Sequence, residues 1–243
     1  MRGFCQPARI LAMCTLLLMA ALGHAGAAPN LFGEEGLILS PTADAMPKGA
    51  YAFGINTVDE TYRRYNTENN GTVTHYYHHA LLPFLDITLA LTNFDNQLLG
   101  RHFGPARPLD SSSGGWNIDK MASARALLLQ QGKAWCSLAV GWRDFTGTSY
   151  FTAKYAVLSR SLPLRPGTGV GLTLHAGYGT GTLKGAFGGV EYRPAESLAL
   201  LLESERGRIH LGARYRLTRQ LDLQPAFLGL RGLGGGVAYH NTW

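Results

Sequence analysis

The sequence predicts an all-β protein, an antiparallel transmembrane β-barrel of about twelve strands that follows a cleaved signal peptide. Three observations lead to this fold class. Apolar residues make up 46% of the chain but alternate with polar ones instead of forming blocks, which indicates strands with two unlike faces. The alternating segments have nearly uniform lengths of about nine to thirteen residues, as a tilted strand needs to cross a bilayer. The long connections between these segments are odd-numbered, and the even-numbered connections are short.

Residues 1–27 have the features of an export signal. Arg2 and Arg9 precede an apolar run that extends from residue 10 to residue 22. Ala25-Gly26-Ala27 then forms a small-residue cleavage site. A lipoprotein with lipid on Cys14 is the less favoured alternative, because the bulky Met13 precedes this cysteine. Apolar runs elsewhere are too short for a membrane-spanning helix.

Export restricts the cysteine chemistry and the class of partner. Cys5 and Cys14 lie in the expected signal, so Cys136 is the one cysteine of the mature chain and no intramolecular disulfide is expected. Loss of the signal lowers the formal net charge from +6 to +4. Because the basic residues are spread singly and the chain is exported, we expect no nucleic-acid partner.

Residues 28–47 are expected to form a periplasmic lead-in segment before a barrel that occupies residues 48–243. Pro41 and Pro47, with small residues between them, favour a fixed extended or turning conformation. Besides a simple lead-in, two other interpretations stay open for this segment. It could fold into the lumen as a plug, or it could dock an export partner.

The predicted strands are defined by period-two alternation. In 170–178 (VGLTLHAGY), alternate residues from Val170 to Tyr178 are apolar or aromatic, and in 208–217 (RIHLGARYRL) an apolar face opposes one with Arg and His. The twelve predicted strands are 48–58, 71–80, 85–95, 119–131, 134–143, 149–160, 169–178, 184–193, 197–205, 208–217, 221–229 and 234–243.

One strand pairing can be predicted in register. If Arg206-Gly207 is a two-residue hairpin turn, Glu205 lies opposite Arg208 and Glu203 lies opposite His210. The same register places Leu202, Leu200 and Leu198 opposite Leu211, Ala213 and Tyr215, respectively. Charge pairs on one face and apolar pairs on the other are the usual determinants of register.

The connections predict the topology. Residues 59–70 and 96–118 are long odd-numbered connections, whereas even-numbered ones such as QQGK and RPAE are short. Long loops at one end and short turns at the other are typical of outer-membrane barrels, whose termini then lie together on the periplasmic side. The expected location is therefore the outer membrane of a Gram-negative bacterium.

A secreted or periplasmic β-sandwich or lipocalin-like barrel is the main rival fold, because it also requires alternation. Strand length, loop parity and the terminal strand favour the membrane barrel. Val237, Tyr239 and Trp243 resemble the C-terminal signal by which the barrel-assembly machinery recognises its substrates, although Asn241 departs from that pattern.

The polar faces predict the residues that point into the lumen, where charges must be solvated or paired. The predicted lumen-facing residues are Arg143, Lys154, Glu203, Glu205, Arg208, His210, Arg214 and Arg216. Two interpretations remain: a plug of salt bridges, or a basic pore surface that holds acidic glycans weakly.

No catalytic, cofactor or metal site is expected. In HYYHH, His75 and His79 share one face of a strand while His78 takes the other, which disfavours joint metal ligation. These histidines, Tyr76 and Tyr77 are more consistent with an aromatic belt at the membrane interface. No GxSxG motif occurs. The Gly-rich stretch 177–189 lacks the strand-to-helix context of a phosphate loop and indicates two strands around a tight loop.

Several stretches resemble the YjbH/GfcD family of outer-membrane proteins. They are GLILSPTADAM (36–46) with Gly49, LLPFLDITLALTNF (81–94), Lys120 with its strand, LAVGWRDFTGTSYFTAKYAVLSRSL (138–162) and FGGVEYRP (187–194). The resemblance implies an outer-membrane barrel in secretion or assembly of exopolysaccharide or group 4 capsule. The resemblance implies a polysaccharide-export lipoprotein as a partner; outer-membrane lipid is expected from the barrel fold, and an acidic polysaccharide from the basic lumen residues.

This resemblance gives the first functional hypothesis, a non-enzymatic barrel that serves exopolysaccharide or capsule export. The alternative is a general porin-like or structural outer-membrane barrel without glycan specificity. A third hypothesis is a barrel enzyme that acts on lipid or glycan.

Overall fold

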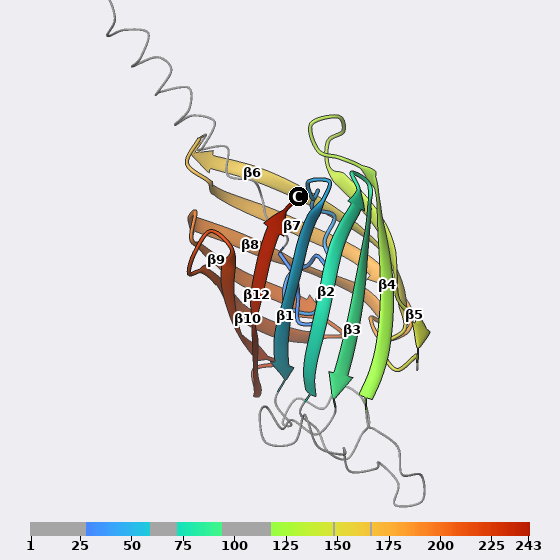
Figure 1. Ribbon diagram of the computed structural model, residues 1–243. Coiled ribbons are helices and arrows are strands. Elements are labelled where there is room, and N and C mark those ends of the chain that lie inside the picture. The colour runs from blue at the N-terminus through green and yellow to red at the C-terminus, as the bar shows by residue number, and fades with distance from the viewer. Residues whose placement is uncertain (1–27, 59–71, 94–117, 148, 166) are drawn as a thin grey trace, which may run out of the picture.

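Twelve antiparallel strands form a closed barrel in the computed structural model (Figure 1). The structure describes residues 28–58, 72–93, 118–147, 149–165 and 167–243. The strands are β1 (Ala50–Val58), β2 (Thr72–Leu82), β3 (Leu85–Asn93), β4 (Ile118–Leu129), β5 (Ser137–Gly147), β6 (Ala153–Arg165), β7 (Val170–Gly179), β8 (Gly185–Ala195), β9 (Leu198–Glu205), β10 (Arg208–Arg216), β11 (Leu221–Leu228) and β12 (Gly232–Thr242). The predicted twelve-strand antiparallel barrel is confirmed; the predicted signal peptide, residues 1–27, lies outside the described residues.

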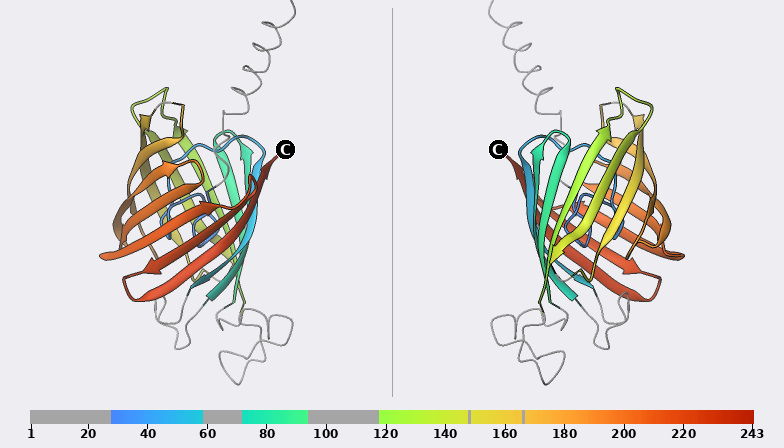
Figure 2. Two further views of the ribbon diagram at one scale, coloured as in Figure 1. Left: turned by 90° about the vertical axis from the view of Figure 1, so that its left-hand side faces the viewer. Right: turned by 90° about the vertical axis from the view of Figure 1, so that its right-hand side faces the viewer.

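Each strand pairs with its neighbours in sequence, and β1 pairs with β12 to close the barrel, from Ala50 opposite Thr242 to Val58 opposite Gly234. Closure satisfies the backbone hydrogen-bonding groups that an open sheet edge would expose to lipid. Figure 2 shows the strong tilt of the strands and the chain segment that they enclose. Among the described residues, no helix is long and apolar enough to cross a membrane.

The β9–β10 hairpin has the predicted register. Glu205 pairs with Arg208, Glu203 with His210 and Leu202 with Leu211. Arg206 and Gly207 both have positive φ, 53° and 71°, as a type I′ turn requires. Glycine at the second position therefore makes the two-residue turn accessible, and the turn sets the register.

The outer surface of the barrel is apolar. Leu200, Leu202, Leu211 and Tyr215 point outward and are 44–46% exposed, whereas Glu203 and other residues of opposite parity on β9 are buried. Water would not favour a continuous band of large apolar side chains, but acyl chains would. This orientation contradicts the rival soluble sandwich or lipocalin-like fold, in which the apolar faces would turn inward.

The N-terminal segment, residues 28–49, fills the inside of the barrel (Figure 2, blue). Its residues from Pro29 to Ala43 are all buried. Leu31, Leu37, Ile38 and Leu39 form an apolar core with Tyr76, Leu201 and Leu228 of the wall and Phe151 of the β5–β6 connection. The segment that the sequence analysis placed as a periplasmic lead-in is, at least over 29–43, a lumen element. Of the interpretations left open there, the plug matches this position.

Candidate functional site: the filled lumen

The lumen segment, defined as residues 28–47, folds locally before it contacts the wall. The Asn30 side chain accepts hydrogen bonds from the backbone N–H groups of Phe32 (2.8 Å) and Glu34 (3.2 Å), in the manner of an Asx turn. Gly33 follows in the left-handed region, with φ of 82°, and the Tyr76 ring packs against its Cα. A side chain at residue 33 would collide with that ring, so glycine permits the close fit.

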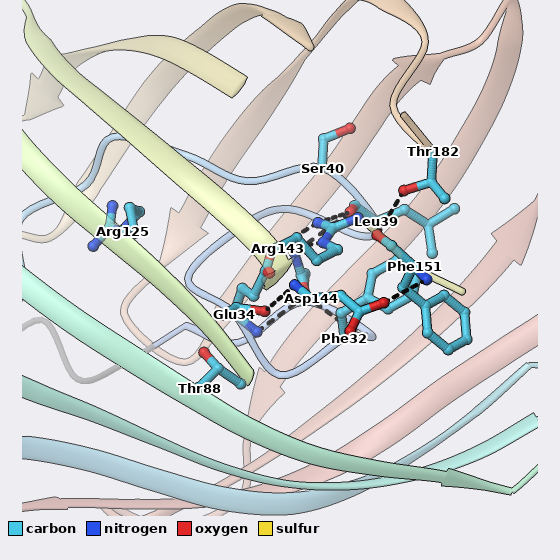
Figure 3. A network of polar contacts seen from close by, with 12 residues as sticks. Phe32, Glu34, Leu39, Ser40, Thr88, Arg125, Arg143, Asp144, Phe151 and Thr182 are labelled. Atoms are coloured by element: carbon cyan, nitrogen blue, oxygen red, sulfur yellow. Dashed lines mark hydrogen bonds and ion pairs between the residues drawn. The ribbon is translucent and has the colours of Figure 1, made fainter. Parts of the chain in front are cut away.

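Arg143, on β5, contacts the segment from a fully buried position. Its Nε and Nη2 donate to Glu34 Oε2 at 2.9 and 2.7 Å, and Nη2 also donates to the Leu39 carbonyl at 3.1 Å. The guanidinium lies over the Phe32 ring, 4.2 Å from its centroid, and this arrangement is visible in Figure 3. Arg143 is completely buried, so its charge is balanced by Glu34 of the segment itself.

Arg125, on β4, holds the second half of the segment. Its Nη1 donates to the backbone carbonyls of Thr42 (2.7 Å) and Asp44 (3.0 Å). Asp86 on β3 orients the guanidinium through its Oδ2 atom, 2.9 Å from Nε and 2.8 Å from Nη2. The wall thus supplies both the cation and the counterion, and the segment supplies only backbone oxygens.

Arg214, on β10, repeats this pattern on the other side of the lumen. Its Nη2 donates to the carbonyls of Gly36 (2.9 Å) and Leu37 (3.2 Å), while Nη1 reaches Glu191 Oε2 at 3.3 Å. Gln224 on β11 accepts from Arg214 Nε at 3.2 Å and donates to the same Leu37 carbonyl at 2.9 Å. Arg125 and Arg143 from the neighbouring strands β4 and β5, and Arg214 from across the lumen, therefore bind one short stretch of backbone.

Glu203, on β9, binds backbone N–H groups of the segment instead of carbonyls. Its Oε2 accepts from three consecutive backbone N–H groups, those of Ile38 (2.8 Å), Leu39 (3.0 Å) and Ser40 (3.2 Å). Successive amides converging on one carboxylate form an anion-binding concavity, and hydrogen bonds to a charged acceptor are stronger than neutral ones. Glu203 therefore fixes the turn at the centre of the segment.

The predicted lumen-facing residues separate into three groups: buried residues, residues near strand ends, and Lys154, which faces outward. Arg143, Glu203, Glu205, His210 and Arg214 are buried inside the barrel. Arg208 has the inward parity but is exposed at the end of β10, and Arg216 is half-buried near the opposite end, 3.5 Å from Asp222.

The prediction for Lys154 is wrong. It lies on the outer face of β6, with its Nζ 4.3 Å from the centroid of the Trp142 ring. The reason is that Tyr155 and Val157 face the lumen and pack in a cluster with Ala43 of the lumen segment. Apolar residues thus occupy both faces of this strand, and alternation of polarity did not reveal which face is inside.

Only part of HYYHH has the outward orientation that the aromatic-belt interpretation requires, and the belt itself stays a prediction. His75, Tyr77 and His79 have outward parity, and the Tyr77 hydroxyl lies 3.2 Å from His79 Nδ1. Tyr76 and His78 are buried in the lumen instead. His78 Nδ1 lies 2.7 Å from Thr88 Oγ1, and its Nε2 lies 2.9 Å from Met46 Sδ. Within the described ranges, no three potential ligands gather as a metal site.

Arg125, Asp86 and Glu191 also lie in the lumen but are not among the residues predicted from the sequence. The signal for Asp86 was present, because LDITLALT alternates cleanly and its polar positions, Asp86, Thr88 and Thr92, all face inward. The sequence indicates the orientation of Arg125 less clearly. The outward positions of β4 are largely alanines, which do not mark that face as strongly apolar.

Val237, Tyr239 and Trp243 also have defined places. Val237 is exposed on the outer face of β12, and the Tyr239 ring stacks on Phe53 of β1 at 5.0 Å between centroids. Trp243 contacts Tyr51 at 4.9 Å. These contacts lie at the seam where the barrel closes, and the role of the three residues as an insertion signal stays a prediction.

The family described as Exopolysaccharide biosynthesis protein YbjH matches residues 28–185. The chain belongs to this YjbH family. The match starts at the first residue of the lumen segment and ends at the first residue of β8, so the family region includes the plug and the strands that supply Arg125 and Arg143. A search of curated proteins found no match.

Several solved barrels are distantly similar. A KdgM porin matches with a TM-score of 0.47 at 9% identity, over 78% of this chain and 98% of that one. An outer membrane channel from Pseudomonas putida F1 gives 0.38 at 10% identity, over 83% and 98%. The translocator domain of an autotransporter from Neisseria meningitidis gives 0.38 at 10%, over 97% of both chains. These likenesses are too distant to carry a functional argument.

Proposed function

We propose that this YjbH-family protein is a non-enzymatic outer-membrane barrel that serves exopolysaccharide or capsule export, and that its lumen segment is a removable plug. Membership of the YjbH family supports a role in exopolysaccharide export, since the family's description refers to exopolysaccharide biosynthesis. The apolar outer face supports the location in a membrane. The periplasmic position of both termini is part of the same proposal.

The observation that carries the proposal is the way in which Arg125, Arg143 and Arg214 hold the segment. All three donate to backbone carbonyls of the segment. An acidic glycan presents carboxylates and hydroxyls, which are acceptors of the same kind and fit a guanidinium at least as well as a carbonyl does. Withdrawal of the segment would expose a ladder of basic donors along the lumen.

The filled lumen argues against the alternative of a constantly open, porin-like channel. Leu37, Ile38 and Leu39 are at most 1% exposed in the middle of the barrel, so the described residues leave no wide path there. A glycan conduit of this construction must open, and the segment is the element whose movement would open it.

A disulfide between segment and wall tests the proposal. The Ala43 backbone N–H donates to Ser159 Oγ at 2.7 Å, so cysteines at 43 and 159, in a Cys136→Ser background, are placed to cross-link. We expect oxidised cells to lose exopolysaccharide export, and a reductant to restore it. The two single-cysteine variants are matched controls and should export normally under both conditions.

Unchanged export with the cross-link formed would reject the removable plug and favour a structural barrel. In planar bilayers, the cross-linked protein should stay closed, whereas the reduced protein should show openings that acidic glycans block more strongly than neutral ones. Equal, size-limited passage of small solutes without glycan preference would favour the porin-like alternative.

A further inference from the structure

Ala28, the first described residue, is folded back against the segment that it begins. Its backbone nitrogen lies 2.8 Å from Glu35 Oε2. Its carbonyl accepts from the Gly36 N–H at 3.1 Å and lies 3.5 Å from Arg214 Nη2. The nitrogen of residue 28 is therefore held at a defined position beside a carboxylate.

Glu35 is a buried carboxylate without a close cation. It is 3% exposed, and among the described residues none of the ion pairs within 4 Å includes it, whereas Glu34 next to it pairs with Arg143. Burial raises the pKa of Glu35 to about 7; Arg125 lowers it, Asp44 raises it, and the Ala28 backbone hydrogen bond and Arg214 lower it further. A neutral amide at Ala28 leaves the charge of this carboxylate poorly balanced.

The sequence supplies a cation at this position. Ala25-Gly26-Ala27 has the small-residue pattern after which signal peptidases cut, and cutting there changes the nitrogen of Ala28. Water adds across the amide bond, the oxygen goes to the carbonyl carbon of Ala27, and the released nitrogen of Ala28 takes a proton to become an ammonium group. We propose that signal cleavage after Ala27 creates an α-ammonium that Glu35 binds, and that this ion pair completes the seating of the lumen segment.

The surroundings of Ala28 fit a new chain terminus. Ala28 lines a cleft of about 490 Å³ together with Glu35, Asp44 and Glu191. The cleft gives the nitrogen room for its additional protons and for water. Arg165 and Arg193 also line it, and Arg193 is paired with Glu191. Glu35, the nearest carboxylate, therefore has the ammonium as its most direct counterion.

The first test measures the terminus and its protection. Mass spectrometry of protein extracted from membranes should give Ala28 as the first residue. An aldehyde reagent selective for α-amines should label the folded protein about tenfold more slowly than the Glu35→Gln variant, because the ion pair holds the amine protonated and shielded. Asp44→Asn is the matched control and should keep most of the protection. Heat-modifiable migration on gels verifies that each variant is folded.

The second test uses pH. The readout is the maleimide reaction of a cysteine at the buried position 43, in a Cys136→Ser background, normalised to unfolded protein at each pH. In protein whose α-amine is acetylated before refolding, Glu35 has a pKa above its unfolded value. Glu35 therefore contributes fully to the stability of the segment in the lumen below about pH 4.5, and this stability is lost as the pH rises toward 7. Reactivity should then increase about tenfold from pH 5 to 7.5.

The free-amine protein should show no such increase, and Glu35→Gln should remove it from the acetylated protein. A mature terminus at another residue would overturn the proposal. Equal labelling of the wild type and Glu35→Gln, or identical pH profiles of free and acetylated protein, would also overturn it. None of these results depends on glycan export, so the export proposal can fail without affecting this one.

Discussion

At the residue scale, the contacts between wall and segment follow a simple division of charge. Arginines donate to backbone carbonyls, and Glu203 accepts from backbone amides. Many of these polar contacts use the main chain of the segment, whereas Arg143 also binds the Glu34 side chain. Specific side chains matter where the fit is close, as at Gly33 beneath Tyr76.

Glu203→Gln should loosen the segment without unfolding the barrel. The substitution removes the charge that three amides share, which weakens the seat by about 1–3 kcal/mol. A cysteine at position 43, in the Cys136→Ser background, should then react with maleimide about tenfold faster or more. Glu196→Gln, at an exposed turn carboxylate, is the control and should leave the rate unchanged. A rate that is equal in both variants would exclude Glu203 as an anchor.

At the element scale, the β9–β10 hairpin explains why much of the barrel can be derived from sequence. The turn residues Arg206-Gly207, the charge pairs and the apolar pairs all require one register, and that register is observed. Strand β6 is the opposite case. Its inward apolar residues contact the lumen segment, a partner far away in sequence, so local alternation placed Lys154 on the wrong face.

The same limit applies to the lumen segment. Prolines and small residues at 41–47 indicate a fixed backbone, but a location inside the barrel depends on Arg125, Arg143 and Arg214 converging from strands distant in sequence. Sequence placed two of these arginines in the lumen. It could not identify what they bind, because their acceptors are backbone carbonyls that every residue carries.

Gly207→Ala should destabilise the hairpin. A Cβ at φ of 71° costs roughly 1–2 kcal/mol, since left-handed backbone is unfavourable for most residues that carry a Cβ. The free energy of unfolding in detergent, measured by urea titration, should fall by about that amount. Gly207→Asn is the matched control and should recover most of the loss, because asparagine tolerates this conformation. Equal losses for Ala and Asn would contradict a type I′ turn.

At the scale of the whole molecule, the barrel is inverted relative to a soluble protein. Its outer face is apolar, and its interior contains buried arginines and carboxylates together with an apolar core around residues 31–39. The interior is stable because the chain supplies its own filling. In the proposed function, this one continuous segment keeps the barrel closed.

The cost of an arginine on the outer face should depend on its depth in the bilayer. Leu202→Arg, near the middle of β9, should make folding into vesicles less favourable by about 2–4 kcal/mol. Ser204→Arg, on the same face near the end of the strand, should cost at most about 1 kcal/mol. Similar small costs at both positions would indicate that water, not lipid, surrounds this face.

Spin labels placed singly at Leu201 and Leu202 test the central claim most directly, that lipid surrounds the barrel and its own N-terminal segment fills it. The label at Leu202, which points outward, should collide with lipid-dissolved oxygen and not with a water-soluble nickel complex. The label at Leu201, which packs against the segment, should be inaccessible to both. Nickel collisions at Leu202 would contradict the membrane barrel, and nickel collisions at Leu201 would contradict the filled lumen.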